Sequence, residues 1–102
     1  MGFHGGLVDA GVLALIEAGV LTGARKRRDR GVHVTAMALG DRTFYDALQR
    51  LPELRFCGAN ITPESAIIAE LDHFVSINSA VEVDLFGQVY AETGGGRQIF
   101  GP

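Results

Sequence analysis

The sequence predicts an α/β fold, in which a mostly parallel sheet carries helices and ends in a C-terminal β-hairpin. Segments with helical spacing alternate with short strand-like segments through residue 71, which is the pattern of parallel strands joined by helices. From His73 through Tyr90 the hydrophobic period changes to two, as in paired antiparallel strands. Hydrophobic residues make up 47% of the 102 residues, so we expect one small globular domain.

The first predicted element is a helix over residues 7–20. Its apolar residues recur at helical spacings, with Asp9 as a candidate N-cap and Gly19 near the end. Four further elements follow, and Asp41 and Thr62 are the candidate N-caps of the two helices among them. In order, they are a strand over 32–39, a helix over 41–51, a strand over 54–59 and a helix over 62–71 with Pro63 at its first position.

The stretch "VSINSAVEVDLFGQV", residues 75–89, is too long for a single strand. At about 3.3 Å per residue it would span about 50 Å, so it must bend or turn. Asn78-Ser79 is a plausible break, and a turn around Gly87 allows "VEVDL" to pair with "QVYAE". The tail over 91–102 contains so many glycines that we expect no regular element there.

Two carboxylates stand out in this stretch, because Glu82 and Asp84 fall on the same face of the expected strand. They could simply face water on the wet side of the hairpin. Alternatively, they could lie at the C-terminal edge of a parallel sheet, where open α/β folds place their ligands. Glu82 would then act as a nucleophile or base, and Asn78 would donate a hydrogen bond.

A second candidate site is the turn His4-Gly5-Gly6 at the start of the first helix. Free N–H groups and the helix dipole favour a phosphate or carboxylate at such a place, and a tight turn without a ligand is the alternative. The basic run over residues 25–30 could hold the phosphates of a nucleotide-like cofactor or be a solvated connection, and no aromatic residue interleaves with it to stack on bases.

Composition excludes several classes of partner. A formal net charge of -3 creates no global field for nucleic acid or an anionic membrane. The apolar stretches are shorter than the roughly 18 residues of a membrane span. The single cysteine, Cys57, cannot form an internal disulfide, so we expect a reducing, cytoplasmic setting. His33 and His73 have no metal-ligand spacing, and no metal is expected.

Four stretches resemble one known family. "VDAGVLALIEAGVLTGARK", "TAMALGDRTFYD", "FVSINSAVEVDLFGQVYAE" and "GGRQIFGP" together resemble the C-terminal domain of the acetyl-CoA hydrolase/transferase family, which includes 4-hydroxybutyrate and butyrate:acetate CoA-transferases. The resemblance runs collinearly over nearly the whole chain, and "SINSAVEVDLFGQV" is its most specific part. It implies that residues 1–102 form a partial CoA-transferase-like α/β/α sandwich, a piece of the C-terminal catalytic domain.

The resemblance also implies a reaction, in which coenzyme A moves from a short-chain acyl-CoA such as acetyl-CoA to a carboxylic acid or to water. In such enzymes a glutamate attacks the thioester, and it commonly lies two residues after a histidine that matches His4. This chain has Gly6 there, so Glu82 is the candidate catalytic carboxylate, with Asn78 supporting it and His4, Gly5 and Gly6 contacting substrate.

Two functional readings follow from this departure. The chain could be a segment that is active only with a missing N-terminal half or through self-association, without nucleic acid or membrane partners. Alternatively, it could be a non-catalytic remnant or interaction module that retains the fold. A search for acyl exchange separates the two readings.

Overall fold

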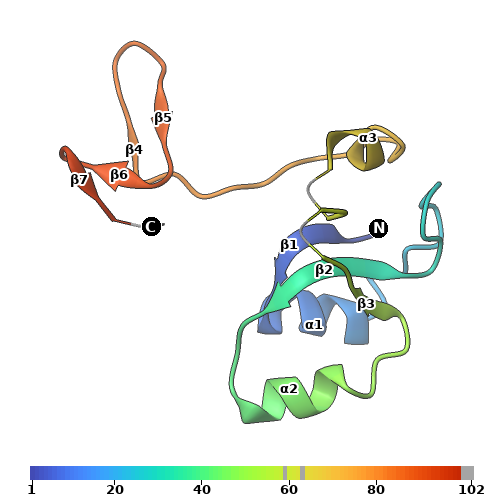
Figure 1. Ribbon diagram of the computed structural model, residues 1–102. Helices are drawn as coiled ribbons and strands as arrows, with labels where there is room; N and C mark the ends of the chain where they lie inside the picture. The colour runs from blue at the N-terminus through green and yellow to red at the C-terminus, as the bar shows by residue number, and fades with distance from the viewer. Residues whose placement is uncertain (59, 63, 100–102) are drawn as a thin grey trace.

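The computed structural model describes residues 1–58, 60–62 and 64–99, which form two parts joined by an extended connection (Figure 1). The first part is a parallel sheet of three strands in the order β1-β2-β3, with bounds His4–Val8, His33–Ala38 and Leu54–Phe56. Helices α1, Ala10–Glu17, and α2, Arg42–Leu48, lie on one side of it, and the short α3, Ser65–Ile68, lies on the other.

Side-chain caps begin the two longer helices where the sequence predicted them. The Asp9 carboxylate accepts the N–H of Val12 at 3.1 Å, and the Asp41 carboxylate accepts the N–H of Phe44 at 2.8 Å. Each bond satisfies one of the free donors in the first turn of a helix. Gly19 follows the end of α1 with φ +72°, a conformation that favours glycine.

The hydrophobic core lies where β1, α1 and α2 meet, and its buried members are Val8, Leu13, Phe44 and Leu48. His33, only 1% exposed, is buried in the same part of the molecule. Its Nε2 donates to the carbonyl of Leu21 at 3.2 Å, and its Nδ1 accepts the N–H of Phe3 at 3.3 Å. A neutral ring satisfies both partners, and burial away from water lowers the pKa of His33.

The second part consists of two antiparallel hairpins. Strands β4, Glu82–Val83, and β5, Val89–Tyr90, pair around a turn that contains Gly87 at φ +83°. Strands β6, Thr93–Gly94, and β7, Arg97–Gln98, pair around Gly95 and Gly96. None of the described residues after Thr62 is buried, so these hairpins are held mainly by turn chemistry.

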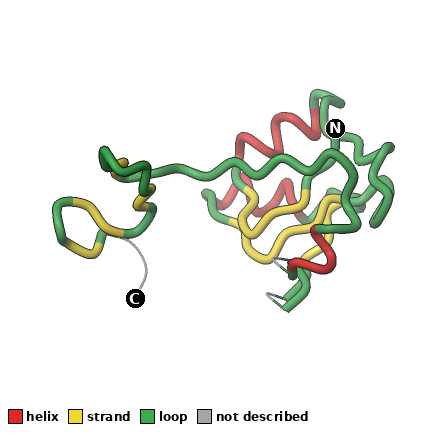
Figure 2. The backbone as a smooth tube through the Cα atoms, turned by 90° about the horizontal axis from the view of Figure 1, so that it is seen from above, coloured by secondary structure: helices red, strands yellow, loops and turns green. Residues whose placement is uncertain are grey.

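The two parts stand apart in space. Figure 2 shows the loop that connects them running away from the sheet to the hairpins, and residues 74–80 within it have no regular structure. The radius of gyration is 15.6 Å, whereas a compact domain of 100 residues has about 13 Å. The chain is therefore more open than an independent domain of its length.

The α/β class, the parallel sheet and the hairpin around Gly87 are confirmed, but the prediction of which segments form the sheet was wrong. Residues 4–8 form a strand that the prediction assigned partly to a helix, because Leu7 and Val8 fit the helical spacing and glycine is uncommon in strands. The prediction of no regular element in the tail over 91–102 was wrong as well, because β6 and β7 pair there. Gly95 and Gly96 both have positive φ, +56° and +75°, as a two-residue type I′ hairpin requires.

The predicted start of α3, with Thr62 as the N-cap, was also wrong, because the helix begins at Ser65. Thr62 is buried, and its hydroxyl lies 3.4 Å from the carbonyls of Cys57 and Gly58 rather than capping a helix. Glu64 occupies the N-cap position without a side-chain hydrogen bond. The predicted place of Pro63 lies outside the described residues. Within the described part of the chain, no helix is long and apolar enough to cross a membrane.

Candidate functional site

His4 lies on β1 and is fixed from across the sheet. Its Nε2 donates to the carbonyl of Thr62 at 2.7 Å, so the loop between β3 and α3 is tied to the first strand. Its Nδ1 is the one buried side-chain polar atom without a hydrogen-bond partner among the described residues. Such an atom is costly to bury, so it stands out as a possible contact for a ligand or for a further segment of protein.

The two glycines after His4 differ in their surroundings. A side chain at Gly5 would come within 2.8 Å of the Phe3 ring, so close packing accounts for this glycine. A Cβ at Gly6 would meet no atom within 4 Å. Because side chains alternate along a strand, this open space lies on the same face of β1 as His4.

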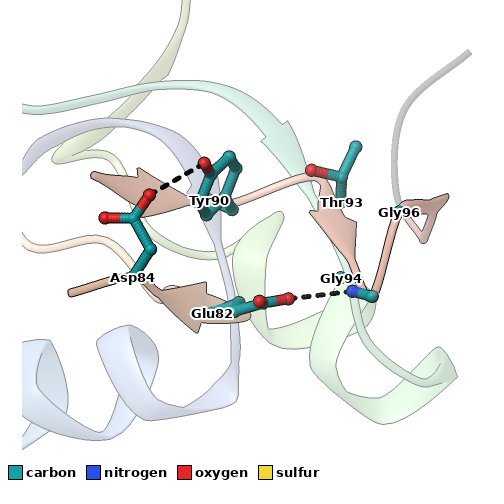
Figure 3. A pocket seen from close by; sticks show the side chains of 7 residues that line it. Glu82, Asp84, Tyr90, Thr93, Gly94 and Gly96 are labelled. Carbon is teal, nitrogen blue, oxygen red and sulfur yellow. Dashed lines mark hydrogen bonds between the residues drawn. The ribbon is translucent and has the colours of Figure 1, made fainter. Parts of the chain in front are cut away.

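Glu82 and Asp84 belong to the other part of the molecule, where they line a pocket of about 260 Å³ (Figure 3). Glu82 Oε2 accepts the N–H of Gly95 at 2.8 Å, and its other oxygen has no hydrogen bond among the described residues. The pocket is formed by both hairpins, and its lining is Glu82, Asp84, Tyr90, Thr93, Gly94, Gly95 and Gly96.

Both carboxylate oxygens of Asp84 accept hydrogen bonds within the first hairpin. Its Oδ1 accepts the N–H groups of Phe86 at 2.8 Å and Gln88 at 2.9 Å, and Tyr90 donates to its Oδ2 at 3.1 Å. The N–H of Gln88, followed by the Tyr90 hydroxyl and further turn amides, lowers the pKa of Asp84. Asp84 is thus a negatively charged turn residue beside the more open carboxylate of Glu82.

The other residues singled out from the sequence are dispersed. Asn78 is exposed in the connection, where its Nδ2 donates to Ser76 Oγ at 2.9 Å, and it does not line the pocket. His4, Gly5 and Gly6 lie in the sheet, apart from the hairpins that carry Glu82 (Figure 1). The residues that the structure describes therefore contain two separate candidate sites.

Two further features bear on ligands. In the basic run, Arg28 pairs with Glu70 at 2.9 Å and Arg27 with Asp72 at 3.7 Å, so part of its charge ties the loop to the residues after α3.

No group of three or more His, Cys, Asp and Glu residues that could hold a metal ion occurs within 1–58, 60–62 and 64–99. The sequence analysis did not identify the Gly95 N–H as a partner of Glu82. The adjacent glycines were the available signal, because a type I′ turn favours glycine at both central positions.

The class of protein follows from comparison with known proteins. The family described as "Acetyl-CoA hydrolase/transferase C-terminal domain" matches residues 40–102, more than half of the chain. The chain belongs to this family, and the expected resemblance is confirmed.

Particular relatives are CoA-transferases. The chain is 40% identical over 101 residues to a butyryl-CoA:acetate CoA-transferase of Anaerostipes caccae and 34% identical over 101 residues to a 4-hydroxybutyrate coenzyme A transferase of Clostridium kluyveri. These matches cover 99% of this chain but only 23% and 24% of the relatives. The crystal structure of RipA from Yersinia pestis superposes with a TM-score of 0.88 and 34% identity over 96% of this chain and 22% of RipA. The chain therefore spans about a quarter of the length of these relatives.

Proposed function

We propose that this chain is a segment of the C-terminal catalytic domain of an enzyme that moves coenzyme A from a short-chain acyl-CoA, such as acetyl-CoA, to a carboxylic acid. The observation that carries the proposal is family membership together with CoA-transferase relatives that match along the whole chain. Water in place of the acid would give hydrolysis by the same chemistry. A cytoplasmic location would give such an enzyme access to acyl-CoA.

The proposed reaction needs a carboxylate nucleophile. A carboxylate oxygen forms a bond to the thioester carbon, the carbon–sulfur bond breaks, and the CoA thiolate leaves a mixed anhydride behind. The thiolate then attacks the enzyme's own carbonyl, which releases the first acid and leaves an enzyme-CoA thioester. The acceptor acid repeats both steps in reverse. Glu82 is our candidate for this role. It lines the pocket, and its Oε1, which does not accept the Gly95 hydrogen bond, is free to attack a thioester there.

The remaining candidates would serve binding. We propose that Asn78 supports the acyl-CoA from the connection and that His4, Gly5 and Gly6 contact substrate at the sheet. The open space at Gly6 can admit part of a ligand, and the unpartnered Nδ1 of His4 lies on the same strand. These two sites would work together only if further polypeptide brings ligand to both.

We propose that the chain alone is inactive and that its partner is the polypeptide that forms the rest of the relatives' length. Large apolar side chains of the connection and of the second part are exposed to water, which is costly for a free protein. Those at least 60% exposed are Val75, Ile77, Val83, Leu85, Phe86 and Val89. The parallel sheet also leaves Met37 61% exposed, although parallel sheets are usually covered on both faces.

The test is exchange of labelled acetate into the CoA pool with butyryl-CoA as donor. It is run on the chain alone and on the chain co-expressed with a polypeptide that supplies the remaining length of the relatives. We expect exchange only in the combination, and we expect Glu82→Gln to abolish it while Glu92→Gln, a change at another exposed glutamate, leaves it intact. Exchange that survives Glu82→Gln would exclude Glu82 as the nucleophile.

The second candidate function is a non-catalytic interaction module that retains the fold. The exposed apolar side chains favour it equally, because they require a covering protein but no chemistry. Absence of exchange in every combination would support this module. Gly6→Glu then adds a decisive variant, since the space at Gly6 can take a side chain and its φ is not in the left-handed region. Exchange gained by Gly6→Glu would place the missing nucleophile at this position.

A further inference from the structure

The two hairpins are joined through one charge-assisted hydrogen bond. Glu82 on β4 reaches across to the turn between β6 and β7, where its Oε2 accepts the Gly95 N–H at 2.8 Å (Figure 3). A hydrogen bond to a carboxylate is shorter and stronger than one between neutral groups. The bond therefore restrains the Glu82 side chain as well as the turn.

Gly94 allows the hairpins to approach closely enough for this bond. A Cβ at Gly94 would lie 2.8 Å from Ile99 Cδ1 and 2.9 Å from Val81 Cγ1, so any side chain there must displace its neighbours. The next two residues adopt φ +56° and +75°, which turns the Gly95 N–H toward β4. The glycine run thus has two separate tasks, which are close approach at Gly94 and the turn that follows.

We propose that the Gly94-Gly95 turn is a positioning element for the Glu82 carboxylate, which it holds by Oε2 so that the other oxygen is presented to the pocket. A held carboxylate needs no reorientation before it attacks a thioester carbon, and misplacement of a reacting group by 1 Å can cost about 100-fold in rate. The effect on rate rests on the proposed function, whereas the bond itself does not. Two experiments therefore test the two halves separately.

The bond is tested by NMR on the full chain, through the chemical shift and hydrogen exchange of the Gly95 amide. Glu82→Gln keeps an acceptor oxygen and should retain most of the protection, whereas Glu82→Ala should lose it. Gly94→Val should lose it too, although Glu82 is intact. Glu92→Ala is the matched control, because the Glu92 side chain has no hydrogen bond among the described residues. Equal Gly95 protection in wild type, Glu82→Ala and Gly94→Val would overturn the proposal.

The positioning role is tested by kinetics in the co-expressed enzyme with acetyl-CoA and butyrate. Gly94→Val should lower kcat by about 10- to 100-fold and leave the KM for acetyl-CoA within about 2-fold, because it misplaces the nucleophile without removing it. An unchanged kcat in a variant whose Gly95 bond is lost would refute positioning. If the wild type shows no exchange, the proposed function fails, and the NMR result still decides whether the bond exists.

Discussion

Phe44 and Phe86 illustrate how the two parts of the molecule differ. Phe44 is 5% exposed in the core beside Leu48, whereas Phe86 is 93% exposed in the turn between β4 and β5. The first part buries a cluster of apolar residues within the chain, although it leaves Met37 61% exposed, whereas no described apolar residue of the second part is buried. The sheet part therefore has its own core, whereas the hairpin part depends on its turns and on burial against other polypeptide.

The largest expected effect comes from truncating each phenylalanine in turn. Phe44→Ala removes a buried ring and should destabilise the chain by about 3 to 5 kcal/mol, which is much of the stability of a small domain. Phe86→Ala should change the free energy of unfolding by less than about 0.5 kcal/mol. Urea unfolding followed by circular dichroism measures both. Similar losses in the two variants would show that the turn is buried in solution.

A smaller effect is expected from pH, and it should be confined to the sheet part. His33 is neutral in the fold because burial lowers its pKa, whereas the unfolded chain takes up a proton near the ordinary value of 6.5. The stabilising contribution is therefore complete above pH 6.5 and is lost as the pH falls through the folded pKa. Urea midpoints between pH 7.5 and pH 5, at about half-unit steps, should fall accordingly.

A control isolates this histidine. His73 is exposed and has φ +54°, so His73→Asn keeps a residue that tolerates this conformation. NMR titration of the His33 ring should show the lowered pKa directly, in this variant as in wild type. A His33 ring that titrates at its ordinary value would contradict the proposed cause.

Local chemistry explains what the sequence could predict. Asp9 and Asp41 cap helices as expected, and β2 and the hairpin around Gly87 were also expected, because caps, alternation and turn glycines are signals carried within a few residues. β1 was missed because its strand character depends on pairing with β2, some 30 residues away. Tertiary pairing of this kind overrides local preference.

The site was predicted less completely than the fold. Glu82 was chosen as a candidate because it was expected at the C-terminal edge of a parallel sheet and because Gly6 stands at the family's usual glutamate position. It lies instead in a separate antiparallel hairpin. Nothing nearby in sequence indicates that its partner is the Gly95 N–H, 13 residues later. The expected regular strand before Asn78 is an irregular connection, because alternating residues without a partner strand do not form a sheet. His4, Gly5 and Gly6 lie in strand β1 rather than in the expected turn at the start of a helix. Their assignment to substrate binding, and that of Glu82 and Asn78 to catalysis, stays a prediction.

Amide hydrogen exchange on the chain alone tests the contrast between the two parts most directly. The Cys57 N–H bonds to Thr35 O at 2.8 Å beside the sheet, and the Val81 N–H bonds to Tyr90 O at the same 2.8 Å in the hairpins. Protection follows the stability of the surrounding structure rather than the length of one bond, so we expect Cys57 to exchange at least about 100-fold more slowly than Val81. Equal protection of the two amides would contradict the account, because it would show that the hairpins are as stable as the sheet without any covering polypeptide.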